Sequence, residues 1–272
     1  REYSRGRTPN PCIICNPHIK FSLLLAEADR VGAHFIATGH YANVIYRNEI
    51  DSYLVSMGKN KSKDQSYMLY RLPRKVLSRL LLPLGEKEDK EDVRRLAESR
   101  SLSGARAKDS QEICFIEGNY QDYLKEKGVG GTPGNFVDTE GNILGRHKGI
   151  TAYTIGQRKG LGIALGKPAY VTEIDAKKNT VTLGDREHLY TDTVLSEQNF
   201  FSETGGDTLP AHMKGKRIQA KIRYSVEPQE GIISSREGLI QVKFDEKQRA
   251  ATPGQSIVFY DGDLVIGGGI IT

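Results

Sequence analysis

The sequence contains little of what a secreted or membrane-bound protein needs. It has three cysteines in 272 residues, whereas a secreted disulfide scaffold carries more and pairs them evenly. Its longest apolar clusters, such as 80–84, are far shorter than the ~18 residues of a membrane span. Residues 1–5 have no apolar core behind them, so no secretory signal is expected. These absences predict a cytoplasmic protein in a reducing compartment, without a membrane partner.

Positive charge is concentrated near the N-terminus. Residues 1–75 hold 12 Lys+Arg and 6 Asp+Glu, and the remaining chain holds 27 Lys+Arg and 28 Asp+Glu. The first part therefore contributes the whole positive excess of a chain whose net charge is +5. Such a field steers a polyanion toward this region, although a slightly basic surface also serves solubility alone.

The first forty residues follow an α/β pattern. Apolar residues at helical spacing predict a helix from about Pro17, ended by Gly32. Cys15 would then lie just before a helix N-terminus, where amide groups and the helix dipole stabilise a thiolate. A short strand at 34–38 ends at Gly39, and ligands in α/β folds gather at the C-terminal ends of strands.

The rest of the chain changes from helices to strands. We expect helices at 65–72, 74–81 and 87–100, then a polar loop at 108–117. Strands are expected at 135–137, 170–175, 180–183, 217–224, 231–234, 239–244, 256–260 and 264–271. The last five predict a small barrel. Boundaries at Gly/Pro-rich segments divide the chain into an α/β domain at 1–126, a β-rich central domain at 127–209 and a C-terminal β-barrel domain at 210–272.

Cys12 and Cys15 form a Cys-x-x-Cys pair. Two sulfurs at this spacing form a disulfide, share a metal or poise one thiol as a thiolate. A zinc knuckle that adds His18 and Cys114 would have atypical spacing. Simple burial is the common alternative for cysteine, but flanking proline and asparagine argue against a core position. Cys114 lies 99 residues after Cys15, in the polar loop.

Several short motifs occur along the chain, at 8–16, 19–21, 37–42, 63–67, 109–110, 113–116, 153–162, 223–224, 252–256 and 267–271. Each is weakly specific alone, and the ordered set is very specific. Together they resemble the tRNA-specific 2-thiouridylases, in family order over nearly the whole chain.

The resemblance implies a fold, a reaction and its residues. The fold would be a partial adenine nucleotide alpha hydrolase-like α/β domain of the PP-loop type, followed by the two β domains. ATP with magnesium would adenylate the C2 oxygen of the wobble uridine, and a persulfide sulfur would replace it. Cys114 resembles the persulfide carrier, and Cys15 resembles the partner that releases the sulfur or closes a disulfide. A cysteine desulfurase or sulfur-relay protein would supply the sulfur.

The same resemblance assigns binding residues. The target base, which must leave the anticodon stack, would be bordered by Asn10, Pro11 and Cys12. Gly39 would sit against ATP. The tRNA contacts would come from His40, Lys63, Asp64, Gln65, Arg223, Tyr224 and Gln255. Taken singly, each has an ordinary explanation: a strand-end histidine, a helix cap at Asp64, or cross-strand neighbours. The glycines at 156–162 fit a tight turn and are not interpreted as a nucleotide loop.

Two features depart from the family pattern. Many members carry Asp where this chain has Cys12, so Cys12, Cys15 and Cys114 are predicted to hold three corners of a [4Fe-4S] cluster. The ATP-binding sequence Ser-Gly-Gly-x-Asp-Ser, expected before the first motif, does not occur in the sequence. We therefore expect either a segment of a longer protein or a natural truncation, with an exposed sheet edge and low stability. Two alternatives stay open, a non-catalytic tRNA-binding remnant and a Cys-x-x-Cys thiol–disulfide oxidoreductase.

Overall fold

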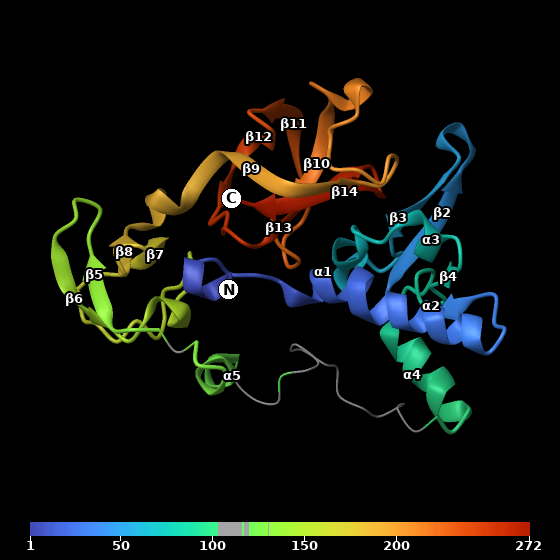
Figure 1. Cartoon of the computed structure of the whole chain (residues 1–272), viewed down its shortest axis with the longest axis horizontal. Helices are drawn as coiled ribbons and strands as arrows, with labels where there is room; N and C mark the ends of the chain where they lie inside the picture. The colour runs from blue at the N-terminus through green and yellow to red at the C-terminus, as the bar shows by residue number, and fades with distance from the viewer. Residues whose placement is uncertain (103–115, 117–119, 130) are drawn as a thin grey trace.

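The computed structural model describes residues 1–102, 116, 120–129 and 131–272. Figure 1 shows a barrel beside two smaller bodies, one built mainly from residues 1–102 and one from the central part of the chain. The mixed α/β part, the central sheet and the terminal barrel confirm the expected fold class. None of the helices in these described ranges has the length and apolar character needed to cross a bilayer.

The first long helix begins earlier than the apolar pattern predicts. It comprises α1 (Pro11–Cys15), a π-helical turn η2 (Asn16–Lys20) and α2 (Phe21–Arg30). The Asn10 side chain caps α1 by accepting from the backbone N–H of Cys12 at 3.2 Å. Pro17, which has no N–H to donate, lies within the π turn, where the N–H of Phe21 bonds the carbonyl of Asn16. The expected start at Pro17 is therefore wrong.

The elements around this helix are short. Strand β1 (Ile36–Ala37) pairs in parallel with β4 (Leu80–Leu81), so the helix expected at 74–81 ends early, as α3 (Arg74–Leu77). The helix expected at 65–72 is a 3₁₀ turn, η5 (Ser66–Leu69), and that at 87–100 is α4 (Lys90–Ser99). The remaining helices and turns are α5 (Tyr120–Glu126), η1 (Tyr3–Arg5), η3 (Asn48–Ile50), η4 (Lys61–Lys63), η6 (Ile150–Ala152), η7 (Arg186–Leu189) and η8 (Ala211–Met213).

A hairpin that the sequence analysis did not anticipate joins the N-terminal part to the barrel. Its strands are β2 (Ala42–Arg47) and β3 (Ser52–Met57), which pair in antiparallel register from Ala42 with Met57 onward. Strand β3 also pairs with the last strand, β14 (Leu264–Ile271). The hairpin thus extends the sheet of the C-terminal domain (Figure 1).

The C-terminal barrel has six strands, one more than predicted. They are β9 (Tyr190–Phe201), β10 (Arg217–Lys221), β11 (Gln229–Arg236), β12 (Leu239–Arg249), β13 (Ser256–Asp261) and β14. The order β13-β10-β11-β12-β9-β14 closes through pairing of β13 with β14. Inward residues such as Phe201, Ile233, Val242 and Phe259 fill the interior. Strand β9 falls inside the range 127–209 that the sequence analysis assigned to the central domain. The domain boundaries stay a prediction.

The central sheet has the order β6-β5-β8-β7, packed around Phe136, Val171 and Val181. Its strands are β5 (Gly134–Val137), β6 (Ile143–His147), β7 (Tyr170–Asp175) and β8 (Thr180–Gly184). Three of them match the strands expected in this part of the sequence. Strand β6 was not expected.

One hydrophobic core spans the N-terminal part and the barrel. It includes Phe21 and Leu25 of α2, Tyr67 and Leu69 of η5, and Tyr260 of β13. The Tyr67 hydroxyl donates to the carbonyl of Ser256 at 2.8 Å. Because buried side chains of η5 lie in this shared core, loop 63–69 is fixed against the barrel.

Candidate functional site

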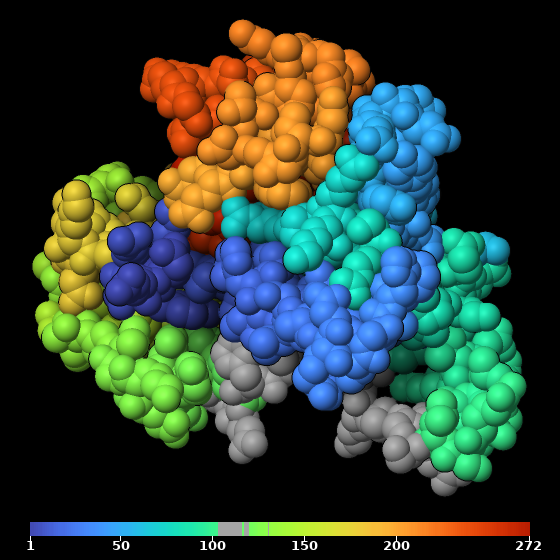
Figure 2. Space-filling model, turned by 45° about the vertical axis from the view of Figure 1, so that its right-hand side comes forward, coloured from blue at the N-terminus to red at the C-terminus, as the bar shows by residue number. Residues whose placement is uncertain are grey.

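The segment before the cysteine pair is held by the barrel. The backbone N–H of Thr8 donates to the carbonyl of Pro253 at 2.8 Å, and the side-chain amide of Gln255 donates to the carbonyl of Thr8 at 2.8 Å. The guanidinium of Arg7 pairs with Glu197 at 2.7 Å. In Figure 2 these N-terminal residues, in dark blue, lie between the central domain and the α1–α2 helix, below the barrel. Gln255 is thus engaged inside the protein.

The two described cysteines lie on α1. Cys12 is in its first turn and Cys15 is its last residue, and both are half-buried. The structure contains no disulfide between them. The prediction that Cys15 lies just before a helix is wrong, because Asn10 and Pro11 begin the helix earlier. The anion-stabilising amides of the first turn are therefore nearer Cys12 than Cys15.

Met68 joins both ends of this short helix to loop 63–69. The amide nitrogen of Asn10 lies 3.5 Å from the Met68 sulfur. The amide nitrogen of Asn16, a buried residue, donates to the Met68 carbonyl at 2.8 Å. Residue types alone gave no signal for Met68, because its role depends on contacts distant in sequence.

Loop 63–69 has one cationic side chain that faces solvent and polar side chains that face the protein interior. Lys63 is exposed, whereas Asp64 is only 4% exposed. The Asp64 carboxylate accepts from the N–H groups of Gly58 and Ser66 at 2.9 and 3.2 Å, and from the Ser66 hydroxyl at 2.7 Å. Gln65 exchanges two hydrogen bonds with the backbone of Tyr41, at 2.8 and 3.0 Å. Asp64 therefore organises the loop.

His40 follows β1, as the sequence pattern predicts, and is half-buried. Its Nδ1 lies 2.8 Å from the Thr38 hydroxyl, and its ring packs near that of Phe21. Burial, with a smaller contribution from the Lys20 charge, lowers the pKa of His40 to about 4. His40 is therefore neutral at pH 7 and offers a ring and hydrogen-bonding nitrogens, not a positive charge. The neighbouring Gly39 is exposed.

Arg223 and Tyr224 lie where loop 63–69 meets the barrel. The Tyr224 ring is 6.2 Å from that of Tyr67, and the ammonium of Lys221 lies 6.0 Å from the Tyr224 ring centre. Burial lowers the pKa of Lys221, and Asp64 partly offsets this. The Arg223 guanidinium donates to the carbonyl of Ala250. Lys221 is a residue that the sequence analysis missed.

The three-cysteine arrangement is only partly described, because Cys114 lies outside the described residues. The structure therefore gives no distance between Cys114 and either Cys12 or Cys15. Within residues 1–102, 116, 120–129 and 131–272, no group of three or more His, Cys, Asp or Glu side chains forms a metal-binding cluster. The iron–sulfur arrangement stays a prediction.

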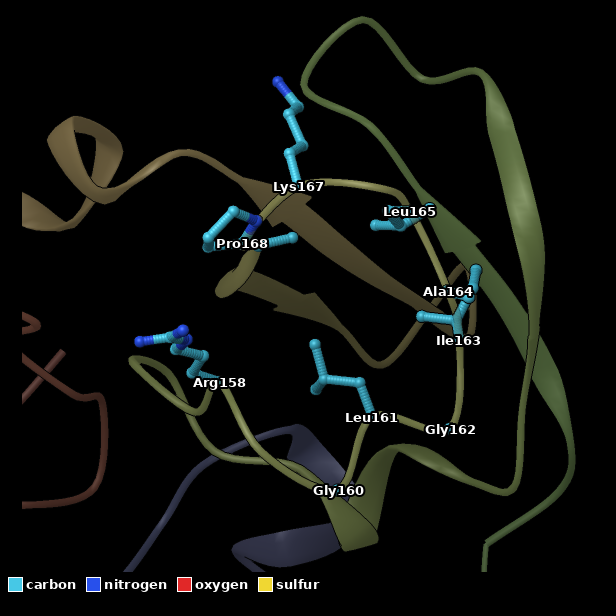
Figure 3. Close-up of a pocket in the computed structure, with 10 residues that line it drawn as sticks. Arg158, Gly160, Leu161, Gly162, Ile163, Ala164, Leu165, Lys167 and Pro168 are labelled. Atoms are coloured by element: carbon cyan, nitrogen blue, oxygen red, sulfur yellow. The ribbon is translucent and has the colours of Figure 1, made fainter.

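The glycine-rich segment of the central domain forms a turn and borders a shallow hollow. Figure 3 shows its wall of apolar side chains, including Leu161, Ile163 and Pro168, with two cations at its rim. Lys167 is neutralised by Asp185 at 3.1 Å, whereas Arg158 points toward the ribbon of the barrel. The expectation that 156–162 forms a tight turn agrees with the left-handed φ of Gly156, Gly160 and Gly162.

These contacts bring most of the predicted site residues around one end of α1. Loop 63–69 reaches Asn10 through Met68, and the barrel reaches the segment before Asn10 through Gln255. Gln65 connects the same loop to the chain just after His40. Sequence reasoning found these residues by motif and missed Met68 and Lys221, which contact them.

Comparison with known families accounts for this arrangement. Family models match residues 1–118 (tRNA methyl transferase HUP domain), 121–185 (tRNA methyl transferase PRC-barrel domain) and 204–271 (Aminomethyltransferase beta-barrel domain). An α/β HUP domain followed by two β domains defines a multidomain class of tRNA-modifying enzyme.

Curated relatives define the family within that class. The chain is 50% identical to tRNA-specific 2-thiouridylase MnmA 2 of Caldanaerobacter subterraneus subsp. tengcongensis, covering 99% of this chain and 73% of the relative. It is 49% identical to tRNA-specific 2-thiouridylase MnmA of Acetivibrio thermocellus, over 99% of this chain and 74% of the relative. The corresponding protein of Syntrophomonas wolfei is 46% identical, over 100% and 78%. The chain belongs to the tRNA-specific 2-thiouridylase family.

Proposed function

We propose that this chain takes part in ATP-dependent 2-thiolation of the wobble uridine of tRNA. The observation that carries the proposal is the convergence at Asn10. The barrel holds the preceding segment at Thr8, and Met68 of loop 63–69 contacts the Asn10 side chain. The base-bordering set Asn10, Pro11 and Cys12 is thus supported from two sides by segments proposed to bind tRNA.

The tRNA contacts divide by their exposure in the free protein. Lys63 and Tyr224 are exposed, so they are available to a phosphate and to a base, respectively. The Asp64 carboxylate already accepts three hydrogen bonds, so its contact with tRNA would come through the backbone of the loop. His40, being neutral, would donate or accept a single hydrogen bond. Gln255 would contact tRNA while its amide holds Thr8.

The proposed chemistry uses ATP as a co-substrate, with Gly39 beside it at the end of β1. The C2 oxygen of uridine attacks the α-phosphorus, and pyrophosphate leaves. The outer sulfur of a Cys114 persulfide then attacks C2, and AMP leaves with the former C2 oxygen. Cys15, as a thiolate, attacks the inner sulfur of Cys114, so that the persulfide bond breaks and a Cys15–Cys114 disulfide forms. Two electrons from a thiol reductant restore both cysteines.

A thiolation assay with purified chain and matched variants tests this proposal. Unmodified tRNA is incubated with ATP, magnesium and a cysteine desulfurase with cysteine, and 2-thiouridine is detected by retarded migration in a mercury-containing gel. Product from the wild type would support the proposal, and C15S and C114S should then show a loss of at least about 100-fold, because nucleophilic groups are removed. Lys247→Ser, an exposed barrel change, is the control expected to retain activity.

The alternatives give different outcomes. If the chain binds tRNA but does not bind ATP and does not thiolate uridine, it is the non-catalytic remnant. A chain whose thiol–disulfide exchange survives C114S but not C12S or C15S is the oxidoreductase. The iron–sulfur hypothesis requires iron, sulfide and a visible absorption band after anaerobic purification, and an active, colourless and iron-free protein would contradict it.

A further inference from the structure

The turn 154–159 of the central domain is built rigidly against the barrel. The side-chain oxygen of Gln157 accepts from the N–H of Thr154 at 3.1 Å, and its amide donates to the carbonyl of Lys159 at 3.0 Å. The N–H of Gly156 donates to the carbonyl of Val171 at 2.8 Å, which fixes the turn to β7. Gly156 has φ +88°, and a Cβ there would approach the Ala250 side chain to 3.0 Å. The barrel and this turn are therefore in close contact.

The outer residues of the turn are two consecutive exposed cations. Neither Arg158 nor Lys159 forms an ion pair with any carboxylate in the described parts of the chain. Lys167, farther along the same segment, differs because Asp185 neutralises it. The turn thus presents two uncompensated positive charges on a backbone held by hydrogen bonds.

Further cations of the barrel lie beside this turn. The Arg223 guanidinium is 3.9 Å from the position of a Cβ on Gly156, and Arg249 lies 5.6 Å from the ring centre of Tyr170, next to Val171. Burial lowers the pKa of Arg223, and repulsion from Arg249 lowers it further. Two domains therefore contribute positive charge to one seam, where the excess favours an anion.

The seam adjoins the candidate reaction site. The hydroxyl groups of Thr154 and Thr8 are 3.4 Å apart, and Thr8 lies two residues before Asn10. If Asn10 borders the target base of a polynucleotide, the phosphates next to that base would lie near this turn. No motif assignment made from the sequence gives the turn a binding role.

We propose that turn 154–159 is a backbone-binding element for RNA, in which Arg158 and Lys159 hold phosphates next to the target nucleotide and Arg249 extends the contact onto the barrel. The inference rests on the proposed function, because it takes tRNA as the ligand. Cations on a rigid turn bind phosphate without reading the base, so the element positions tRNA and contributes no sequence preference. The central domain would thereby share in substrate binding.

The salt dependence of tRNA binding tests this proposal. Binding of unmodified tRNA is measured by filter retention from about 50 to 300 mM KCl for the wild type and R158Q/K159Q. We expect the slope of log K against log salt to become shallower by roughly 1.5, and the affinity near 0.1 M salt to fall on the order of tenfold. The melting temperature should not change, because both side chains are exposed.

Two controls and two outcomes decide the result. R158K/K159R keeps both charges and should retain the wild-type slope. K177Q/K178Q removes the same charge from the β7–β8 turn and should also retain it. A wild-type slope in R158Q/K159Q would overturn the inference alone, as expected if the cations serve an acidic protein partner. A wild type that binds no tRNA would overturn the proposed function and this inference together.

Discussion

Loop 63–69 and turn 154–159 lie in different parts of the chain and have the same two-sided construction. Each directs polar groups inward to fix its own backbone and leaves cations outside. The inner groups differ in kind. The loop is fixed by a buried carboxylate and by Tyr67 in a hydrophobic core, whereas the turn is fixed by the half-buried amide of Gln157 and by backbone hydrogen bonds.

This difference separates stability from binding. A buried group that loses its partner carries the full penalty of desolvation, whereas a partly exposed group is compensated by water. Substitutions on the inner side of the loop should therefore lower the free energy of unfolding, and those on the outer side of either segment should weaken only tRNA binding. Motif residues that look equivalent in sequence thus divide into structural and contacting residues.

The largest expected effect comes from Asp64→Ala. It leaves the N–H groups of Gly58 and Ser66 and the Ser66 hydroxyl without their acceptor in a site that is 4% exposed. We expect a loss of about 3 kcal/mol in the free energy of unfolding, measured by urea denaturation. Lys63→Ala, one residue away, should change stability by less than about 0.5 kcal/mol and weaken tRNA binding. Equal free energies of unfolding for Asp64→Ala and Lys63→Ala would refute the division into structural and tRNA-contacting residues.

The sequence predicted the strands more completely than it predicted the helices and the site. Strands at 170–175, 180–183, 256–260 and 264–271 were found because each is a short segment with β-branched or aromatic residues, bounded by turn residues. The hairpin β2–β3 was missed because its burial depends on β14, more than 200 residues away. The π turn that accommodates Pro17 has no local signature, so the proline was interpreted as a helix start.

The candidate site shows the same limit. Family motifs selected Asn10, His40 and Gln65, but not the residues that join them. The contact between Asn10 and Met68 spans 58 residues, and that between Thr8 and Thr154 spans 146. Such pairs form only when the chain is folded. Family motifs therefore selected candidate site residues, whose roles stay a prediction, and the structure shows which of them share a support.

His40, a half-buried residue next to the partner of Gln65, gives a pH test of the contrast between buried and exposed groups. Its expected effect on stability lies between those of Asp64→Ala and Asn10→Ala. Its pKa is about 4 in the folded protein and about 6.5 when unfolded, so the unfolded state binds the proton more tightly. Stability should be fully present above pH 6.5 and decline as pH falls toward 4, by on the order of 2 kcal/mol. Unfolding free energies between pH 7 and pH 4 measure this for the wild type and H40Q. The variant should lose this part of the pH dependence, and parallel curves would contradict the buried, neutral histidine.

Among the side chains that fix the backbone, the smallest expected loss of stability is at Asn10, which belongs to both sides of the comparison. Its side-chain oxygen caps α1 and its amide nitrogen contacts Met68, while its position borders the proposed base site. Asn10→Ala should lower the free energy of unfolding by about 1 kcal/mol through loss of the cap. Asn10→Asp keeps a capping oxygen and should restore most of that stability. If Asn10 also contacts the target base, N10D should remain defective in thiolation although its melting curve is close to the wild type. Full activity in N10D would limit Asn10 to its role as a helix cap.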